Sequence, residues 1–149
     1  MSLLSAGVFD GGDASRTAAS QIASQVKSSP AGLPAGDVTS LADALRDGAK
    51  GTAAKREGAC VVIETVAKEA RAAAEHQTTA LVGDLLRCCA DKHSKETQTA
   101  ACAAMEALAR TMSAHGLRAV LPALLEAMDP HEKWQTMVAA RRFLAVFGE

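Results

Sequence analysis

Aromatic residues are almost absent from this 149-residue sequence. It has no tyrosine, one tryptophan and three phenylalanines, although 48% of its residues are hydrophobic. Alanine supplies much of the hydrophobic content, and alanine is the strongest helix former and small enough for close helix packing. The composition therefore favours an all-α domain with a core of small and aliphatic side chains.

The sequence also lacks an excess of charge of one sign, a long apolar run and a secretory signal. A formal net charge of −1 excludes a polycationic DNA-wrapping domain, though not a local basic strip. No apolar run approaches the roughly 18 to 20 residues of a membrane span, and no basic segment followed by an apolar one opens the chain. The four cysteines are expected to be reduced thiols. We expect a cytoplasmic protein without membrane association.

One apolar helix face recurs along the chain with the spacing i, i+3, i+4, i+7. Its copies start 40, 42 and 39 residues apart, at Ala19, Ala59, Ala101 and Ala140. A second series with the same spacing lies between them and begins at Val38, Val82 and Leu121. Each repeat is therefore a first helix, a short turn and a second helix. A period near 40 favours HEAT or armadillo repeats over shorter helical repeats.

The sequence predicts one domain, 1–149, folded as a right-handed α-α superhelix of about three and a half helical hairpins. A partial repeat covers 1–28, a Pro- and Gly-rich loop covers 29–36, and repeats lie at about 37–71, 77–115 and 117–148. We expect Gly116 to break the chain between repeats and Pro122 to lie near a helix start, where a missing N–H is tolerated. Because no polar capping repeat follows the last apolar helix, we expect a fragment of a longer solenoid.

The last repeat carries the most specific motif. The segment Leu117-Arg-Ala-Val-Leu-Pro-Ala-Leu-Leu-Glu-Ala-Met128, followed by Lys133-Trp134-Gln135, resembles the N-terminal HEAT domain of fungal-type translation elongation factor 3. In that family a leucine-proline first helix precedes a Lys-Trp-Gln triplet that opens the second helix. The same triplet occurs in the related HEAT region of the ribosome-associated activator of the amino-acid-starvation kinase, so both families remain open.

The resemblance implies a module that binds the ribosome. Complete members of the elongation-factor family use twin ABC-type ATPase cassettes to help release deacylated tRNA from the E site. This sequence contains no Gly-x-x-x-x-Gly-Lys-Ser/Thr phosphate loop, and Gly48-Ala-Lys-Gly51-Thr52 is too short to cradle phosphates. We therefore expect a chain that is not an enzyme, with no cofactor and no small-molecule substrate.

Equivalent turns of a solenoid line up along one edge, and here that edge is rich in basic residues. The candidate contacts for ribosomal RNA or a protein partner are Lys50, Lys55, Arg56, Lys92, His93, Lys95, Lys133 and Trp134. Phosphate contact needs positive charge and reach but no reading of bases. A local interpretation is also open, in which Asp47, Asp91 or Asp129 caps the next helix or pairs with a nearby lysine. The alternative function is a protein–protein adaptor without RNA contact.

The tryptophan and the cysteines each have more than one interpretation. Trp134 either packs against a neighbouring helix or is an exposed partner contact. Cys60 and Cys102 lie at equivalent repeat positions, which favours small packing residues. Cys89 and His93 are four residues apart, on one side of a helix end, but a structural zinc site needs four ligands and no second pair is near. We expect neither a metal site nor a catalytic site.

Overall fold

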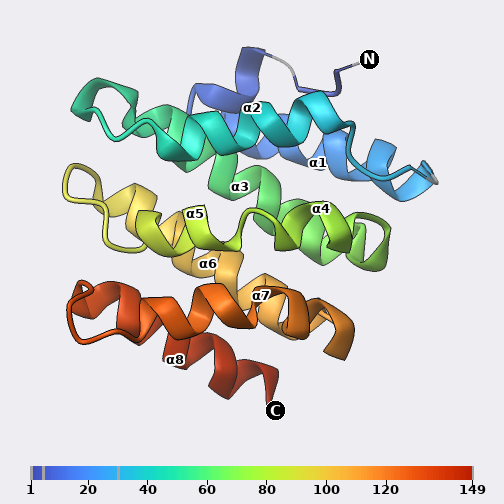
Figure 1. Ribbon diagram of the computed structural model, residues 1–149. Coiled ribbons are helices and arrows are strands. Elements are labelled where there is room, and N and C mark those ends of the chain that lie inside the picture. Colours follow the sequence, from blue (N-terminus) through green and yellow to red (C-terminus); the bar gives the residue numbers. More distant parts are fainter. Residues whose placement is uncertain (1, 5, 30, 149) are drawn as a thin grey trace.

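Figure 1 shows the chain in a computed structural model that describes residues 2–4, 6–29 and 31–148. Pro30 of the predicted loop and the two ends of the predicted domain, Met1 and Glu149, lie outside the described residues. Three short 3-10 turns occur, η1 (Ala6–Phe9), η2 (Lys50–Thr52) and η3 (Arg71–Ala74). The α-helices are α1 (Gly12–Ser28), α2 (Ala35–Arg46), α3 (Ala53–Glu69), α4 (Glu75–Thr79), α5 (Val82–Cys88), α6 (Lys95–Thr111), α7 (Ala114–Ala127) and α8 (Trp134–Phe147). The described residues contain no strand.

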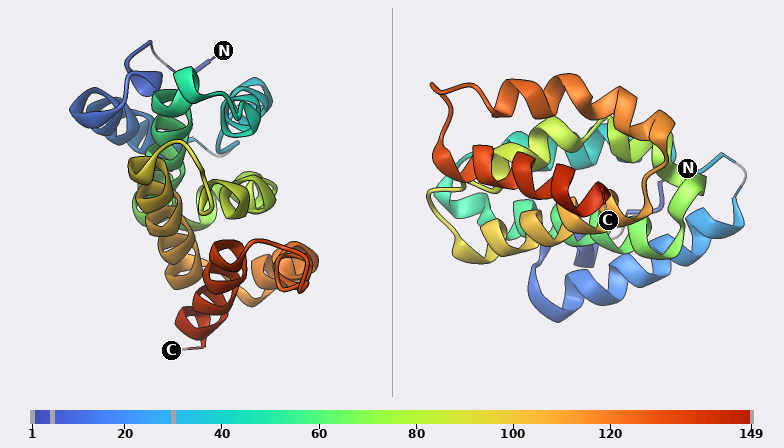
Figure 2. Two further views of the ribbon diagram at one scale, coloured as in Figure 1. Left: turned by 90° about the vertical axis from the view of Figure 1, so that its left-hand side faces the viewer. Right: turned by 90° about the horizontal axis from the view of Figure 1, so that it is seen from below.

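The helices form two parallel layers (Figure 2, left). In one layer α3 packs between α1 and α6, and α6 packs against α8. In the other, α2 contacts α5 and α5 contacts α7. The hairpins α2–α3, α5–α6 and α7–α8 join the layers. The predicted all-α solenoid is therefore confirmed. None of its described helices is long and apolar enough to cross a membrane.

The core lies between the layers and is aliphatic, as the composition predicted. In α3 the predicted face is buried, with Ala59, Val62 and Val66 fully shielded and Ile63 1% exposed. The predicted faces of α1 and α6 are buried as well. Each large aliphatic side chain contributes about 1.5–3 kcal/mol relative to an exposed one. The first helices bury large aliphatic side chains too, among them Leu41, Leu85 and Leu124, so both layers contribute to the hydrophobic stabilisation.

Helix α7 starts earlier than predicted. Ser113 is its N-cap, and the Ser113 hydroxyl accepts a hydrogen bond from the N–H of Gly116 at 3.1 Å. Glu75 in turn accepts hydrogen bonds from the backbone N–H and the hydroxyl of Ser113, at 2.6 and 2.7 Å. Gly116 therefore lies in the first turn of the helix and does not separate two repeats. Pro122 consequently lies inside the helix and not near its start.

The predicted apolar face of α7 is correct only in part. Of its members Leu121, Leu124, Leu125 and Met128, Leu124 is buried and Met128 packs against the core, but Leu121 and Leu125 are 37% and 59% exposed. The face that packs on the core consists of Gly116, Val120, Leu124 and Ala127. The leucine-rich sequence has apolar residues on more than one side of the helix, so spacing alone did not determine which side is buried.

The first helix of the second complete repeat is divided into α4 and α5. Thr78 and Thr79 lie at the division, and their hydroxyls donate to the carbonyls of Glu75 and His76 at 3.2 and 2.9 Å. Such side-chain bonds compete with the helical backbone ladder. The apolar series that begins at Val82 lies in α5, as predicted, whereas the division from α4 was not predicted.

Candidate functional site

The three intra-repeat turns lie one above another along one edge of the solenoid, on the left in Figure 1. They connect α2 to α3, α5 to α6 and α7 to α8. Of the predicted contact residues, the exposed ones are Lys50, Lys55, Lys92, His93, Lys95, Lys133 and Trp134. Within the described part of the chain, none of these lysines forms an ion pair. Exposed Asp47, Asp129 and Glu132 lie in the same turns, but none of them pairs with these lysines in the described structure.

Arg56 is the exception, and its prediction as a contact residue is wrong. It is 2% exposed. Its Nε donates to Asp91 at 2.5 Å, and its Nη1 donates to the carbonyls of Asp47 and Ala49 and to the Thr52 hydroxyl. The guanidinium thus joins the α2–α3 turn to the α5–α6 turn. It holds neighbouring repeats together and is unavailable to an outside phosphate.

Asp91 is the second half of this connection. Its other carboxylate oxygen accepts hydrogen bonds from the backbone N–H groups of His93 and Ser94, at 2.8 and 3.0 Å. Burial alone would raise the pKa of Asp91, but the Arg56 hydrogen bond and these N–H groups outweigh it and lower the pKa. The carboxylate is therefore held ionised inside the turn, where it fixes the backbone that carries Lys92 and His93.

The other turn aspartates act locally as well. Asp47 accepts from the N–H of Ala49 at 3.3 Å, and Asp129 accepts from the N–H of His131 at 2.8 Å. These are bonds to the backbone of the turn itself. Ser94, and not Asp91, is the N-cap of α6. The aspartates bond to their own turns, but neither form of the local interpretation is correct. The N-caps of α3, α6 and α8 are other residues, and no lysine pairs with these aspartates in the described structure, where Asp91 pairs instead with Arg56 of the preceding repeat.

A cleft of about 650 Å³ opens between the turns. Its lining includes Lys92, His93 and Lys133, together with Arg46, Arg56, Arg87 and one acidic residue, Asp91. Lysine and arginine therefore outnumber acidic groups in the lining. The structure brings residues of three turns to one basic cleft, which is the arrangement that phosphate binding requires.

Sequence reasoning missed Arg46 and Arg87. Both pair with the same buried carboxylate, Asp84, which is 4% exposed, and the Arg46 Nε lies 3.2 Å from it. The two arginines occupy the last turns of α2 and α5 and lie 41 residues apart in the sequence. That separation is close to the repeat period, so it could have placed both residues at the same edge.

The remaining predicted residues lie elsewhere. Lys55 lines a separate hollow of about 300 Å³ beside Phe9 and Asp43. Lys95 and Trp134 line a cavity of about 390 Å³ between α6 and α8. Lys50 begins η2 and lines none of these three hollows. The predicted residues are thus spread over several surfaces, and the cleft is the most basic of the hollows described.

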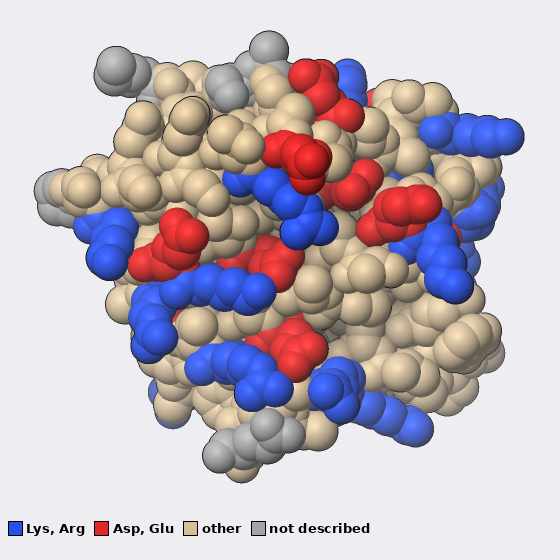
Figure 3. All heavy atoms as spheres, turned by 180° about the vertical axis from the view of Figure 1, so that it is seen from behind, with Lys and Arg blue, Asp and Glu red and all other residues tan. Residues whose placement is uncertain are grey.

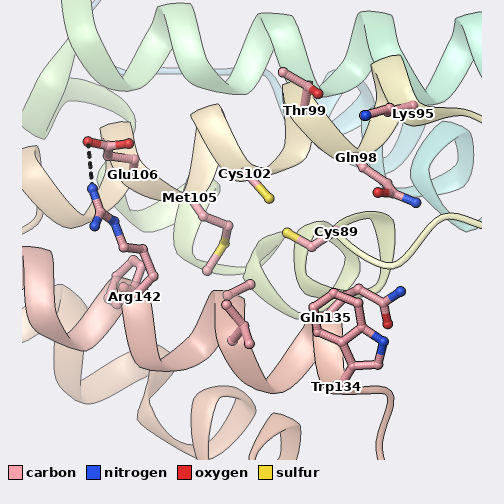
Figure 4. Close-up of a pocket in the computed structure, with 13 residues that line it drawn as sticks. Cys89, Lys95, Gln98, Thr99, Cys102, Met105, Glu106, Trp134, Gln135 and Arg142 are labelled. Carbon is pink, nitrogen blue, oxygen red and sulfur yellow. Dashed lines mark ion pairs between the residues drawn. The ribbon is translucent and has the colours of Figure 1, made fainter.

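The cavity between α6 and α8 is largely apolar (Figure 4). Trp134 is 69% exposed, so it does not pack inside the described structure. Cys102 lines the cavity and is exposed, whereas Cys60 at the equivalent position of α3 is buried. The packing role predicted for both cysteines is therefore confirmed for Cys60 and wrong for Cys102, because α8 leaves this part of α6 uncovered.

The pair Cys89 and His93 does not form a common site. Cys89 lines the apolar cavity, while His93 lines the basic cleft. Across the described residues, no three His, Cys, Asp or Glu side chains are placed to hold a metal ion.

The rear face, formed by the layer of α1, α3, α6 and α8, has charges of both signs interleaved (Figure 3). Lys68 pairs with Glu64 at 2.6 Å, and Glu106 pairs with Arg110 at 2.9 Å and with Arg142 at 3.9 Å. The Arg110 hydrogen bond lowers the pKa of Glu106. These cations are matched by carboxylates, in contrast to the lysines of the turn edge.

Comparison with known proteins adds one finding. Residues 15–148 match the family described as EF3 N-terminal HEAT repeat. No curated protein and no solved structure matches the sequence. The family match extends from α1 through α8 and so includes all three turns of the basic edge.

Proposed function

We propose that this chain, which belongs to the family of EF3 N-terminal HEAT repeats, docks a translation factor onto the ribosome. The observation that supports docking is the basic cleft between the intra-repeat turns. The proposed target is the phosphate backbone of ribosomal RNA, since clustered cations bind phosphates without reading sequence.

The lysines of the cleft are the proposed contacts. Lys92 and Lys133 come from different turns, line the same cleft and are exposed without an ion pair in the described structure. Arg46 and Arg87 share the single carboxylate of Asp84, so their combined charge exceeds that of their partner. Arg56 and Asp91 shape the cleft from behind and neutralise each other.

The proposed role is binding alone, in the cytoplasm. ATP hydrolysis, which the elongation-factor resemblance assigns to ABC-type cassettes, requires a phosphate loop that these 149 residues do not contain. The module would bring such cassettes to the ribosome, and they would supply the catalysis.

Charge reversal in the cleft tests this proposal. We expect the variant K92E/K133E to cosediment less with ribosomes. We also expect the slope of log K against the logarithm of salt concentration to become less negative, by about 1 for each lost phosphate contact. The matched control is K27E/R118E, which makes the same charge change at the opposite edge, at the end of α1 and near the start of α7. Equal losses in the two variants would contradict the proposal, because net charge would then explain the effect.

A protein–protein adaptor is the second candidate, and exposed apolar side chains favour it. Leu125, Trp134 and Val138 are 59%, 69% and 53% exposed, and aromatic residues are common anchors at protein interfaces. If this function is correct, W134A weakens binding to a ribosomal-protein partner without changing the salt dependence. Loss of affinity in K92E/K133E with unchanged affinity in W134A would exclude it.

A further inference from the structure

The four cysteines are arranged as two pairs of neighbouring thiols. Cys60 of α3 is hydrogen-bonded to Cys88 of α5, and Cys89 at the end of α5 is hydrogen-bonded to Cys102 of α6. Figure 4 shows the Cys89 and Cys102 sulfurs pointing toward each other at the wall of the apolar cavity. The two thiols of each pair are therefore neighbours across a helix interface.

The pairs differ in access to solvent. Cys60 and Cys88 are 0% and 3% exposed, and the Cys88 thiol donates to the carbonyl of Leu45 at 3.6 Å. In the other pair Cys89 is 3% exposed, but Cys102 is exposed in the cavity. Only the second pair thus combines an accessible sulfur with a buried sulfur behind it.

The second pair is also chemically asymmetric. The hydrogen bond from Cys89 lowers the pKa of Cys102 to about 7, although partial burial opposes this shift. The same bond and burial raise the pKa of Cys89. Because the thiolate is the reactive form of cysteine, Cys102 is the nucleophile at neutral pH and Cys89 retains its proton.

We propose that Cys102 and Cys89 form an oxidisable dithiol site whose oxidant is hydrogen peroxide. In the first step the Cys102 sulfur attacks one peroxide oxygen, the O–O bond breaks, and sulfenic acid and water are formed. In the second step the Cys89 thiol gives its proton to the hydroxyl group of the sulfenic acid as its sulfur attacks the Cys102 sulfur. The S–O bond breaks, and a disulfide and a second water are formed. The two cysteines lose two electrons and two protons in total, and the peroxide is reduced to water.

The disulfide would join the end of α5 to the middle of α6 inside one repeat. Cys102 lines the same cavity as Trp134 and Val138. The disulfide would therefore replace an exposed thiol with a sulfur–sulfur bond in the lining of that cavity. The site is separate from the basic cleft, so this inference does not depend on ribosome docking.

Peptide mapping of the oxidised full chain tests the proposal directly. Trypsin releases Cys88 and Cys89 together in residues 88–92, Cys102 in residues 96–110 and Cys60 in residues 57–68. After a small molar excess of hydrogen peroxide and blocking of free thiols, we expect a cross-link between 88–92 and 96–110, with the loss of two hydrogen atoms. Peptide 57–68 is expected to remain unlinked, because its thiol is buried.

Variants identify the two partners. C88S is expected to keep the cross-link, whereas C89S is expected to lose it and to accumulate sulfenic acid at Cys102 that dimedone traps. The alkylation rate of Cys102 is expected to rise through a midpoint near pH 7 and to shift upward in C89S. A cross-link to peptide 57–68, a dimedone adduct as the final product of the unmodified chain, or an unreactive Cys102 would overturn the proposal.

Discussion

The guanidinium of Arg56 lies between two consecutive turns, with hydrogen bonds to one and an ion pair to the other. The Arg56 and Asp91 side chains are 2% and 7% exposed. Removal of one member of a buried ion pair leaves the other charge buried without a partner. The resulting loss of folding free energy is larger than the net stabilisation that the intact pair provides. The polar connection between these two turns therefore adds to the apolar packing of α3 against α6.

Replacement of this arginine is expected to destabilise the fold. R56M retains an unbranched side chain but removes the charge and all four hydrogen bonds, so we expect the free energy of unfolding to fall by about 3–5 kcal/mol. Urea denaturation measures it. The control is R46A, since Arg46 is 60% exposed and its loss should cost less than about 1 kcal/mol. Similar losses in both variants would show that the Arg56 pair is not a structural connection.

Stability should depend on pH through Asp91. The folded-state pKa lies below the ordinary value of 3.8, so the stabilisation is complete above that value and is lost as the pH falls through the folded pKa. We expect the difference in unfolding free energy between the unmodified chain and D91N to narrow as the pH is lowered from 6 toward 3. The Asp129 carboxylate accepts a hydrogen bond from the N–H of His131 in its own turn and pairs with no arginine among the described residues, so D129N is the control. A difference that is constant with pH would contradict this account.

Among the helices, α7 departs most from its expected form. Pro122 lies in its interior and is exposed, where the ring removes one helical hydrogen bond. The helix persists because Ser113 caps it and Val120, Leu124 and Ala127 pack on the core. Tertiary packing therefore outweighs the local cost of the proline.

Removal of that proline should stabilise the chain. In P122A the backbone N–H becomes able to donate to the carbonyl of Arg118, and we expect a gain of about 2 kcal/mol, reduced by the greater freedom of the unfolded chain. Thermal and urea unfolding measure the gain. A neutral or destabilised variant would mean that the proline ring makes a compensating contact, contrary to its exposure.

The sequence predicted the second helices well because one face of each is strictly apolar, as with Ala59, Val62 and Val66 in α3. It was less successful at α7. Leu124 is buried as predicted, but Leu121 and Leu125 matched the spacing and are exposed, and Val120 is buried in their place. Apolar periodicity predicts that a segment is helical. When apolar residues occur on several sides of the helix, the side that is buried depends on the neighbouring helices.

The candidate site was predicted in part for a similar reason. Lys55 and Arg56 are adjacent and equally basic in the sequence, yet Lys55 is exposed and Arg56 is buried. The difference arises from Asp91, 35 residues away in the next repeat. The repeat period predicts that the turns lie at one edge. The carboxylate that pairs with each cation can come from another repeat, so it depends on how the repeats stack.

At the scale of the whole molecule, stacking places three turns at one edge and brings their cations together although the net charge is −1. The rear face pairs its cations with carboxylates, while the lysines of the turn edge remain unpaired within the described structure. The stacking thereby gathers lysines and arginines around the cleft without a basic sequence overall, although Asp47, Asp129 and Glu132 lie in the same turns. The proposed phosphate contact relies on this local excess of cations in the cleft.

The most direct test of this account is the salt dependence of ribosome binding by the unmodified chain. If the turn edge contacts several RNA phosphates, log K falls linearly as log salt rises, with a slope of about −0.7 to −0.9 for each contact. We predict a steep negative slope that becomes shallower in K92E/K133E and does not change in K27E/R118E. Ribosome binding that is independent of salt, or no binding at low salt, would contradict the central claim.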